Sequence, residues 1–253
     1  MIKVAKQDDS EDRILADLRA LVEKLPPLPA RPLDGWDRND EAAVRAIGMA
    51  WGWFMRVLRT AEAIRILEKN GYAVECSPMR RSVVEHVIRL HWVTTVDTRT
   101  FVEAALNKRK HSLDIIKRAA KAGIPLSDDA LDLVELLQSE TDPENDKASF
   151  KDLTSLMNDI PDYQTLFQIW LTETQESHAT IMSSSTYVDF TDEPAVHLHM
   201  EPSPRNRFAA MLPSMVLLAI ESYVHLTGMS DHLSEPLTSI RERVTRLGSA
   251  IDN

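Results

Sequence analysis

The sequence predicts an all-α protein, a single bundle of about eight or nine helices with a small β-hairpin near residues 187–200. Two observations support this fold class. Apolar residues recur at steps of three and four along most of the chain. Glycine is scarce, at seven residues in 253, and aromatic residues make up 6% of the chain, whereas a β-sandwich needs many turns.

The N-terminal segment, residues 1–35, is predicted to form one helix and a proline-rich linker ahead of the main helical domain, residues 36–253. Ser10 fits an N-cap, and apolar residues follow it at helical spacing as far as Leu25. The stretch PPLPARPLDG then ends the helix. This first helix could pack on the main body or on another subunit.

The main domain is predicted to be a succession of helices. Gly71 and Gly123 are suitable C-terminal caps, and Ser127 is a suitable N-cap. The stretch YVDFTDEPAVHLHM alternates like a hairpin, with DEP at its turn. We expect helices at residues 40–70, 78–96, 97–123, 127–140, 150–158, 161–180, 205–228 and 234–250.

Charge and composition exclude several classes of protein. A formal net charge of −10 disfavours non-specific binding to DNA or to an anionic membrane, because both require a positive field. Cys76 is the only cysteine, which excludes an intrachain disulfide and a cysteine-based zinc site. The N-terminus has no apolar signal region, and the longest apolar run is too short to span a bilayer. We therefore expect a cytoplasmic protein with no membrane partner.

Two predicted helices carry charged residues on apolar faces. In the first, a stripe of apolar residues leads to Glu62, for which Arg59, Arg81 or a histidine could be the partner. In the second, Arg81 and Glu85 are one turn apart and can pair directly. An unpaired buried carboxylate costs several kcal/mol, so these groups predict either a structural ion-pair network or a polar pocket. The expected pocket residues are Glu62, Arg81, Glu85, His86 and His178.

The stretches PMRRSVVEHVIRLHWV and RTAEAIRILEKNGY resemble the arginine-x-x-x-glutamate helix region of a widespread bacterial all-helical family of unknown function. A later helix of that family carries a tyrosine, a leucine-serine or leucine-threonine pair and a histidine. It is similar to YQTLFQIWLTETQESH, which contains Tyr163, Leu166, Leu171, Thr172 and His178. The resemblance covers residues 40–190. It implies an all-helical fold and a place for a site, without an established activity.

Arg81 and His86 are spaced as R-x4-H, which resembles the signature of HEPN ribonucleases, helical proteins of bacterial toxins and phage defence. The resemblance implies an RNA substrate and a site at a homodimer interface. His86 would act as the acid or base and Arg81 would stabilise phosphorane charge, with Glu85 beside them. A basic helix face could hold RNA or simply be solvated. It consists of Lys108, Arg109, Lys110, Lys117, Arg118 and Lys121.

A small-molecule binding or sensing module is the next hypothesis. Tryptophans on several predicted helices, together with a few polar groups, could form an aromatic ligand cavity, although tryptophans also simply fill cores. The tryptophans concerned are Trp51, Trp53, Trp92 and Trp170. The expected ligand-binding residues are Glu62, Trp92, Tyr163 and His178.

Two further hypotheses remain. A carboxylate-histidine metal site could form from Glu62, Glu85 and His178, or a metal could bind His197 and His199, but the Glu-x-x-His motif of di-iron proteins is missing. We therefore assign no metal ligands and leave the cofactor open. A protein-interaction or immunity role is the last hypothesis. The N-terminal helix and the apolar segment 211–226, where Pro213 would kink or start a helix, could form an oligomer interface.

Overall fold

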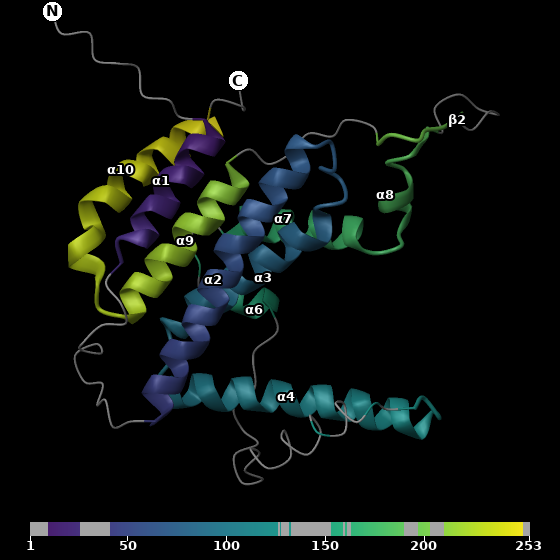
Figure 1. Ribbon diagram of the computed structural model, residues 1–253, viewed down its shortest axis with the longest axis horizontal. Helices are drawn as coiled ribbons and strands as arrows, with labels where there is room; N and C mark the ends of the chain where they lie inside the picture. The colour runs from purple at the N-terminus through teal and green to yellow at the C-terminus, as the bar shows by residue number, and fades with distance from the viewer. Residues whose placement is uncertain are drawn as a thin grey trace, which may run out of the picture.

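The computed structural model describes residues 10–25, 41–125, 127, 132, 153–158, 160, 163–189, 197–202 and 210–249. In these residues the chain is an all-α bundle with one short two-stranded sheet, as predicted (Figure 1). The helices are α1 (Glu11–Glu23), α2 (Glu41–Lys69), α3 (Ser77–Val93), α4 (Thr98–Lys121), α6 (Leu153–Met157), α7 (Tyr163–Ser177), α8 (Ile181–Ser184), α9 (Met211–Leu226) and α10 (Ser230–Ser249). The strands are β1 (Val188–Asp189) and β2 (His197–Leu198).

The helix α3 lies in the middle of the bundle, in contact with α2, α6, α7 and α9. Its buried residues occupy most of its circumference, because neighbouring helices cover it on several sides. Val83, Val84, Val87, Ile88 and Leu90 are all at most 1% exposed. Charged side chains on this helix are therefore placed close to the core.

The most apolar helix, α9, is enclosed by α1, α2, α3 and α10. Its apolar side chains are almost all buried within the chain, so the segment 211–226 is core and is not the exposed oligomer interface that its composition suggested. Pro213 is the third residue of α9 and starts the helix without breaking it. Among the described helices, none has both the length and the apolar character needed to cross a bilayer.

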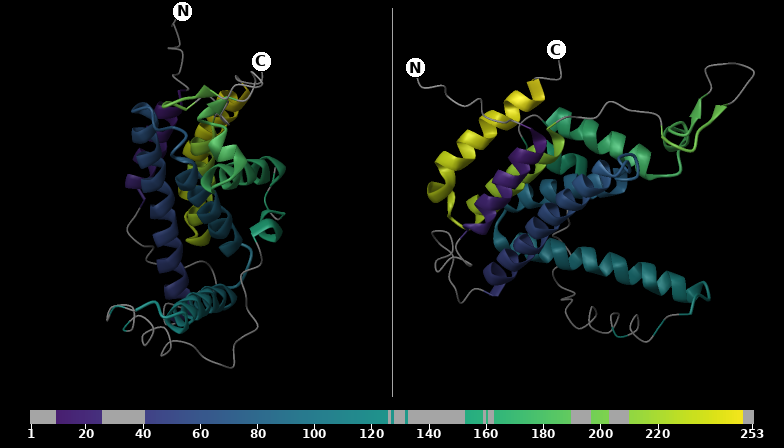
Figure 2. Two further views of the ribbon diagram at one scale, coloured as in Figure 1. Left: turned by 90° about the vertical axis from the view of Figure 1, so that its right-hand side faces the viewer. Right: turned by 45° about the horizontal axis from the view of Figure 1, so that its top comes forward.

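The N-terminal helix α1 packs on the main body, which was one of the two arrangements expected from the sequence. Ile14 and Leu18 are fully buried in the core shared with α2, α3 and α9. Asp17 accepts a hydrogen bond of 2.6 Å from the buried Arg243 of α10. Figures 1 and 2 show α1 lying alongside α9 and α10. The linker PPLPARPLDG lies outside the described residues.

Several helices end at capping residues, of which Ser10, Gly71 and Gly123 were predicted from the sequence. Ser10 caps α1 by accepting a hydrogen bond from the backbone N–H of Arg13, and Asp97 caps α4 in the same way with Thr100. Gly71 and Gly123 follow α2 and α4 with φ values of 88° and 79°, a left-handed conformation that glycine adopts without strain. Because these signals are local, the corresponding helix boundaries could be predicted from the sequence.

Two parts of the chain extend away from the bundle. The helix α4 contacts α2 near its start, and its far end projects outward, with Lys117, Arg118 and Lys121 exposed (Figure 1). The side chains of Lys108, Arg109 and Lys110 lie outside the description. The strands β1 and β2 form the predicted antiparallel hairpin next to α8 (Figure 2). The predicted DEP turn and all of the predicted helix 127–140 except residues 127 and 132 fall outside the described ranges.

Candidate functional site

Three of the residues predicted from the sequence meet between α3 and α7. The Nε group of Arg81 donates to Oε1 of Glu85 at 2.9 Å, and Nη1 of Arg81 lies 2.6 Å from Nε2 of His178. Trp170 of α7 donates its indole N–H to the same Glu85 oxygen at 3.3 Å. We call Arg81, Glu85, Trp170 and His178 the Arg81 cluster. The direct pairing of Arg81 with Glu85, expected from their spacing, is confirmed.

The Arg81 cluster is accessible to solvent. The side chains of Arg81 and Glu85 are 28% and 29% exposed, and His178 is exposed. Two of the five N–H groups of the Arg81 guanidinium bind Glu85 and His178, and the other three have no partner among the described residues. For His178 to accept the Arg81 N–H, its Nε2 must carry no proton. The cluster therefore combines a fixed cation that has unused donors with an exposed histidine.

Glu62 does not join this cluster. It is partly exposed on α2 and pairs with Arg19 of α1, a partner that was not among those expected. Both residues line a separate cavity of about 350 Å³ between α1 and α2. Periodicity identified the face of α2 on which Glu62 lies, but the identity of the helix packed against that face depends on the tertiary structure.

His86 also lies apart from Arg81, because a step of five residues turns about 140° around a helix. Its Nδ1 is 2.6 Å from the backbone carbonyl of Ser82. Burial lowers the pKa of His86 below its ordinary value of 6.5, and the positive charges of Arg56 and Arg89 lower it further, against the hydrogen bond to Ser82. The histidine beside Arg81 is His178, while His86 is a partly buried imidazole on another face of α3.

The predicted aromatic ligand contacts are dispersed. Trp92 is 4% exposed and packs edge-on against Phe101, with ring centroids 6.2 Å apart. Tyr163 is 39% exposed at the first residue of α7, about 10 Å along the helix from Trp170. Trp92 therefore fills the core and Tyr163 lies on the surface. Of the four predicted ligand-binding residues, only His178 belongs to the Arg81 cluster.

The two histidines of the hairpin, His197 and His199, are exposed. Among the residues that the structure describes, no group of three or more His, Cys, Asp or Glu side chains is arranged to hold a metal ion.

A buried ionic network next to the Arg81 cluster was missed by the sequence reasoning. Arg80 donates from Nε to Oε1 of Glu173 at 2.6 Å, and from Nη1 to the carbonyl of Ala73 at 2.7 Å. The hydroxyl of Ser77 donates to Oε2 of Glu173 at 2.6 Å. Nη1 of Arg80 is also 3.4 Å from Oε1 of Glu68. These contacts connect α2, α3 and α7 through side chains that water barely reaches.

Burial alone would lower the pKa of Arg80, but the carboxylates of Glu173 and Glu68 outweigh it and raise the pKa above the ordinary value. The guanidinium is thus charged, and its Nε and Nη1 groups are engaged by Glu173, Ala73 and Glu68. One signal in the sequence could have identified it. Arg80 shares its helix face with Val83, Val84 and Val87, at steps of three, four and seven residues.

Comparison with models of protein families gives a match. A family model described as a family of unknown function (DUF5677) matches residues 48–195. This segment covers more than half of the chain and includes the whole Arg81 cluster. No curated protein and no solved structure matches the chain significantly. The match confirms the expected membership of a family of unknown function, and it does not show the resemblance to HEPN ribonucleases.

Proposed function

The chain belongs to the DUF5677 family of unknown function, and we propose that it binds a small anionic ligand at the Arg81 cluster. The observation that supports this proposal is the hydrogen bonding of the Arg81 guanidinium. Glu85 fixes its Nε edge, while three N–H groups have no partner among the described residues. A planar cation that is held in place with free donors is well suited to two oxygens of a carboxylate or a phosphate.

The charge of the chain favours a small anion over a long polyanion. Phosphate contacts spread along a nucleic acid require an extended positive surface, which a net charge of −10 does not favour. A single accessible arginine needs no such field, because its contact with one anionic group is local. Glu85 neutralises part of the Arg81 charge, which makes binding dependent on hydrogen-bond geometry as well as on attraction.

Each member of the cluster has a distinct part in this proposal. Arg81 anchors the anion. Glu85 is a positioning residue, because it orients the guanidinium and is itself held by the Trp170 indole. His178 lies at the rim, where it can accept or donate a proton on a bound ligand.

Nuclear magnetic resonance of the Trp170 indole N–H group, which is retained in the wild-type protein and in the Arg81 variants, tests the proposal, with inorganic phosphate and acetate as probes. We expect both anions to shift this resonance with saturation. Arg81→Ala should weaken binding about tenfold or more, since a hydrogen bond to a charged group contributes about 1.5–3 kcal/mol. Arg81→Lys should also bind weakly, because it keeps the charge but loses the planar fork.

The matched control is Arg99→Ala. Arg99 pairs with Glu103 at the same four-residue spacing on α4, and among the described residues no histidine contacts this pair. Its loss should leave anion binding unchanged. Equal binding by wild-type protein and Arg81→Ala would contradict the proposal.

Cleavage of RNA is a second candidate function, and the contact between Arg81 and His178 favours it. In such a reaction His178 would transfer the proton at the 2′-hydroxyl or at the leaving oxygen, and Arg81 would stabilise charge on the phosphorane oxygens. The assignment of the histidine differs from the R-x4-H pattern, because His86 lies on another face of α3. A role in toxin or phage-defence systems is proposed only together with this second function, RNA cleavage.

Self-association is part of the proposed function. Exposed apolar residues on α8, on β2 and just after β2 support it, namely Ile181, Leu198 and Met200, which are 76%, 79% and 100% exposed. Sedimentation analysis of wild-type protein and a variant with these three residues changed to Ser measures it. The proposal predicts a homodimer that this variant converts to a monomer.

A further inference from the structure

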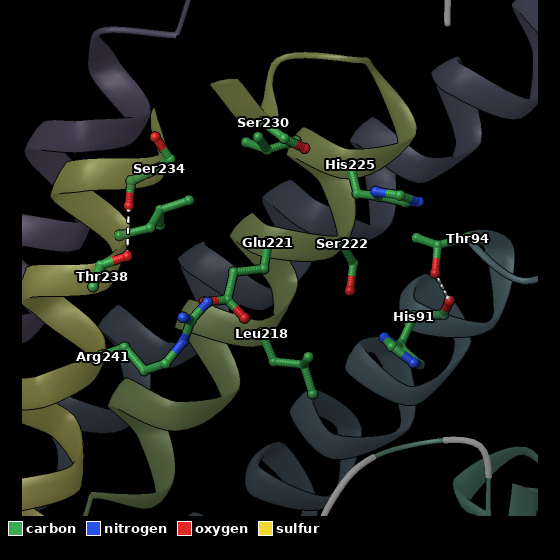
Figure 3. Close-up of a pocket in the computed structure, with 12 residues that line it drawn as sticks. His91, Thr94, Leu218, Glu221, Ser222, His225, Ser230, Ser234, Thr238 and Arg241 are labelled. Atoms are coloured by element: carbon green, nitrogen blue, oxygen red, sulfur yellow. Dashed lines mark hydrogen bonds and ion pairs between the residues drawn. The ribbon is translucent and has the colours of Figure 1, made fainter. Parts of the chain in front are cut away.

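A second cavity, of about 520 Å³, lies between α3, α9 and α10 (Figure 3). Leu218, Glu221, Ser222 and His225 line it from one face of α9, at helical spacing. The C-terminal turns of α3 form one wall and a face of α10 forms the other. Cavities of this size commonly hold small organic ligands.

Ser222 has an unused hydroxyl on the wall of this cavity. The residue is 3% exposed, and its Oγ has no hydrogen-bond partner in the part of the chain that the structure describes. Serines within helices commonly donate to a carbonyl of the preceding turn, but this hydroxyl does not. In Figure 3 it points into the space between α9 and α3. A buried polar group of this kind calls for a bound partner, since leaving it unpaired is destabilising.

Two histidines flank Ser222 from different helices. His225 lies one turn further along α9, and His91 faces it from the last turn of α3 (Figure 3). An imidazole presents a donor and an acceptor on one ring, and it offers a flat surface. Thr94, next to His91, donates its hydroxyl to the His91 carbonyl at 2.6 Å. The side of the cavity formed by α9 and α3 therefore presents the Ser222 hydroxyl and two imidazoles, and Ser230, Ser234 and Thr238 line the side toward α10.

The charged residues of the cavity neutralise each other. Arg241 of α10 donates from Nη2 to Oε1 of Glu221 on α9 at 2.6 Å and also contacts this oxygen through Nε at 3.2 Å. Arg241 and Glu221 form an ion pair, so these two side chains together contribute no net charge to the wall of the cavity. Leu218, Val224 and Leu237 supply its apolar surface.

We infer that this cavity binds an uncharged organic molecule that carries a hydrogen-bond donor and an acceptor beside an apolar ring or chain. The hydroxyl of Ser222 binds the polar group, and the two histidines enclose it. The site is independent of the Arg81 cluster, because Arg81 precedes His91 by ten residues on α3, about 15 Å along the helix. The two sites therefore select ligands of different charge.

Three probes of nearly equal shape and different charge test this inference: benzamide is neutral, benzoate is negative and benzamidine is positive. Binding is followed by the methyl resonances of Leu218, Val224 and Leu237 in the full-length protein. We expect benzamide to shift these resonances with saturation at millimolar concentration, and the two ions to bind about tenfold more weakly. Equal binding of all three, or no shift with benzamide up to its solubility limit, would overturn the inference.

Benzamide binding by three single-residue variants tests whether the molecule binds in this cavity. Ser222→Ala should weaken benzamide binding about fivefold, the effect of one hydrogen bond, while leaving the thermal midpoint unchanged or higher. Thr238→Trp, at an exposed position on the α10 wall, should fill the cavity and abolish binding. Ser249→Ala, on α10 outside the cavity, is the matched control and should have no effect. Benzamide binding that survives both Ser222→Ala and Thr238→Trp would also overturn the inference.

Discussion

Arg80 and Glu173 join α3 to α7 through a contact of 2.6 Å between Nε and Oε1, and each side chain is 7% exposed. The next residue, Arg81, has a side chain four times as exposed, at 28%. A step of one residue turns a helix by about 100°, so neighbouring arginines face different surroundings. Arg80 belongs to the buried network, and Arg81 belongs to the accessible cluster.

Loss of Glu173 should be strongly destabilising. Glu173→Ala leaves the Arg80 guanidinium buried without its main counter-charge, which typically costs about 3–5 kcal/mol in the free energy of unfolding. Urea denaturation measures this cost. Glu85→Ala is the control, because Glu85 is partly exposed in its own ion pair and should cost about 1 kcal/mol or less. Similar losses in the two variants would show that burial of the Arg80–Glu173 pair does not increase the cost of breaking it.

A double substitution tests the same pair from the other direction. Arg80→Met combined with Glu173→Leu removes both charges and keeps apolar volume, so we expect it to be more stable than either single variant. The comparison uses urea denaturation of all three proteins. If the double variant were less stable than both single variants, this would contradict the expectation that removing both charges relieves the cost of an unpaired buried charge.

The lowered pKa of His86 predicts that the free energy of unfolding depends on pH. Its pKa in the folded protein is lower than the ordinary value of 6.5, chiefly because of burial, so the unfolded chain binds a proton at this residue at a higher pH than the folded chain does. The free energy of unfolding should therefore decrease as the pH falls below about 6.5. His86→Gln should reduce this decrease, measured by urea denaturation at about pH 7 and about pH 5.

His225→Gln is the control for this measurement, because His225 is exposed. It should retain the wild-type decrease in stability at acidic pH. An unchanged pH dependence in His86→Gln would mean that the folded protein accommodates the protonated imidazole at this position.

Cleavage of a fluorescent single-stranded RNA distinguishes the two candidate histidines. If the wild-type protein cleaves RNA, Arg81→Ala and His178→Ala should reduce the rate about 100-fold or more, while His86→Ala should retain most of it. Relief of growth toxicity on expression should follow the same order. Loss of activity in His86→Ala alone would support the R-x4-H assignment, and an inactive wild-type protein would remove RNA cleavage from consideration.

The packing of α1 on the bundle predicts that two leucine substitutions in this helix lower the free energy of unfolding by different amounts. Leu18 is fully buried in the common core, so Leu18→Ala should lower the free energy of unfolding by about 2–5 kcal/mol. Leu15, on the same helix, is only partly buried, and Leu15→Ala should cost less. Equal and small effects would indicate that α1 contributes little to the stability of the single chain.

Much of the secondary structure could be predicted because its signals are local. Gly71 and Gly123 ended α2 and α4 as expected, and the alternating stretch at 187–200 formed a hairpin. The Arg81–Glu85 pair was predictable for the same reason, since residues four apart on a helix are neighbours regardless of what surrounds the helix.

The long-range contacts were harder to predict. Glu62 was placed with Arg81 because both lie on apolar faces, yet its partner is Arg19 of α1. The Arg80–Glu173 contact joins residues 93 positions apart, and nothing in the spacing of either helix identifies the other. The apolar segment 211–226 was ambiguous, because a core helix and an interface helix share the same composition.

By itself, the sequence determined which segments are helical, where many of them end and which charged residues share a face, because backbone conformation and periodicity are properties of neighbouring residues. Only the tertiary structure decided which faces meet. It separated Arg80 from Arg81, brought His178 rather than His86 to the guanidinium, and left Ser222 on the wall of a cavity. These outcomes depend on how whole helices pack, since burial and charge pairing are settled by residues far away along the chain.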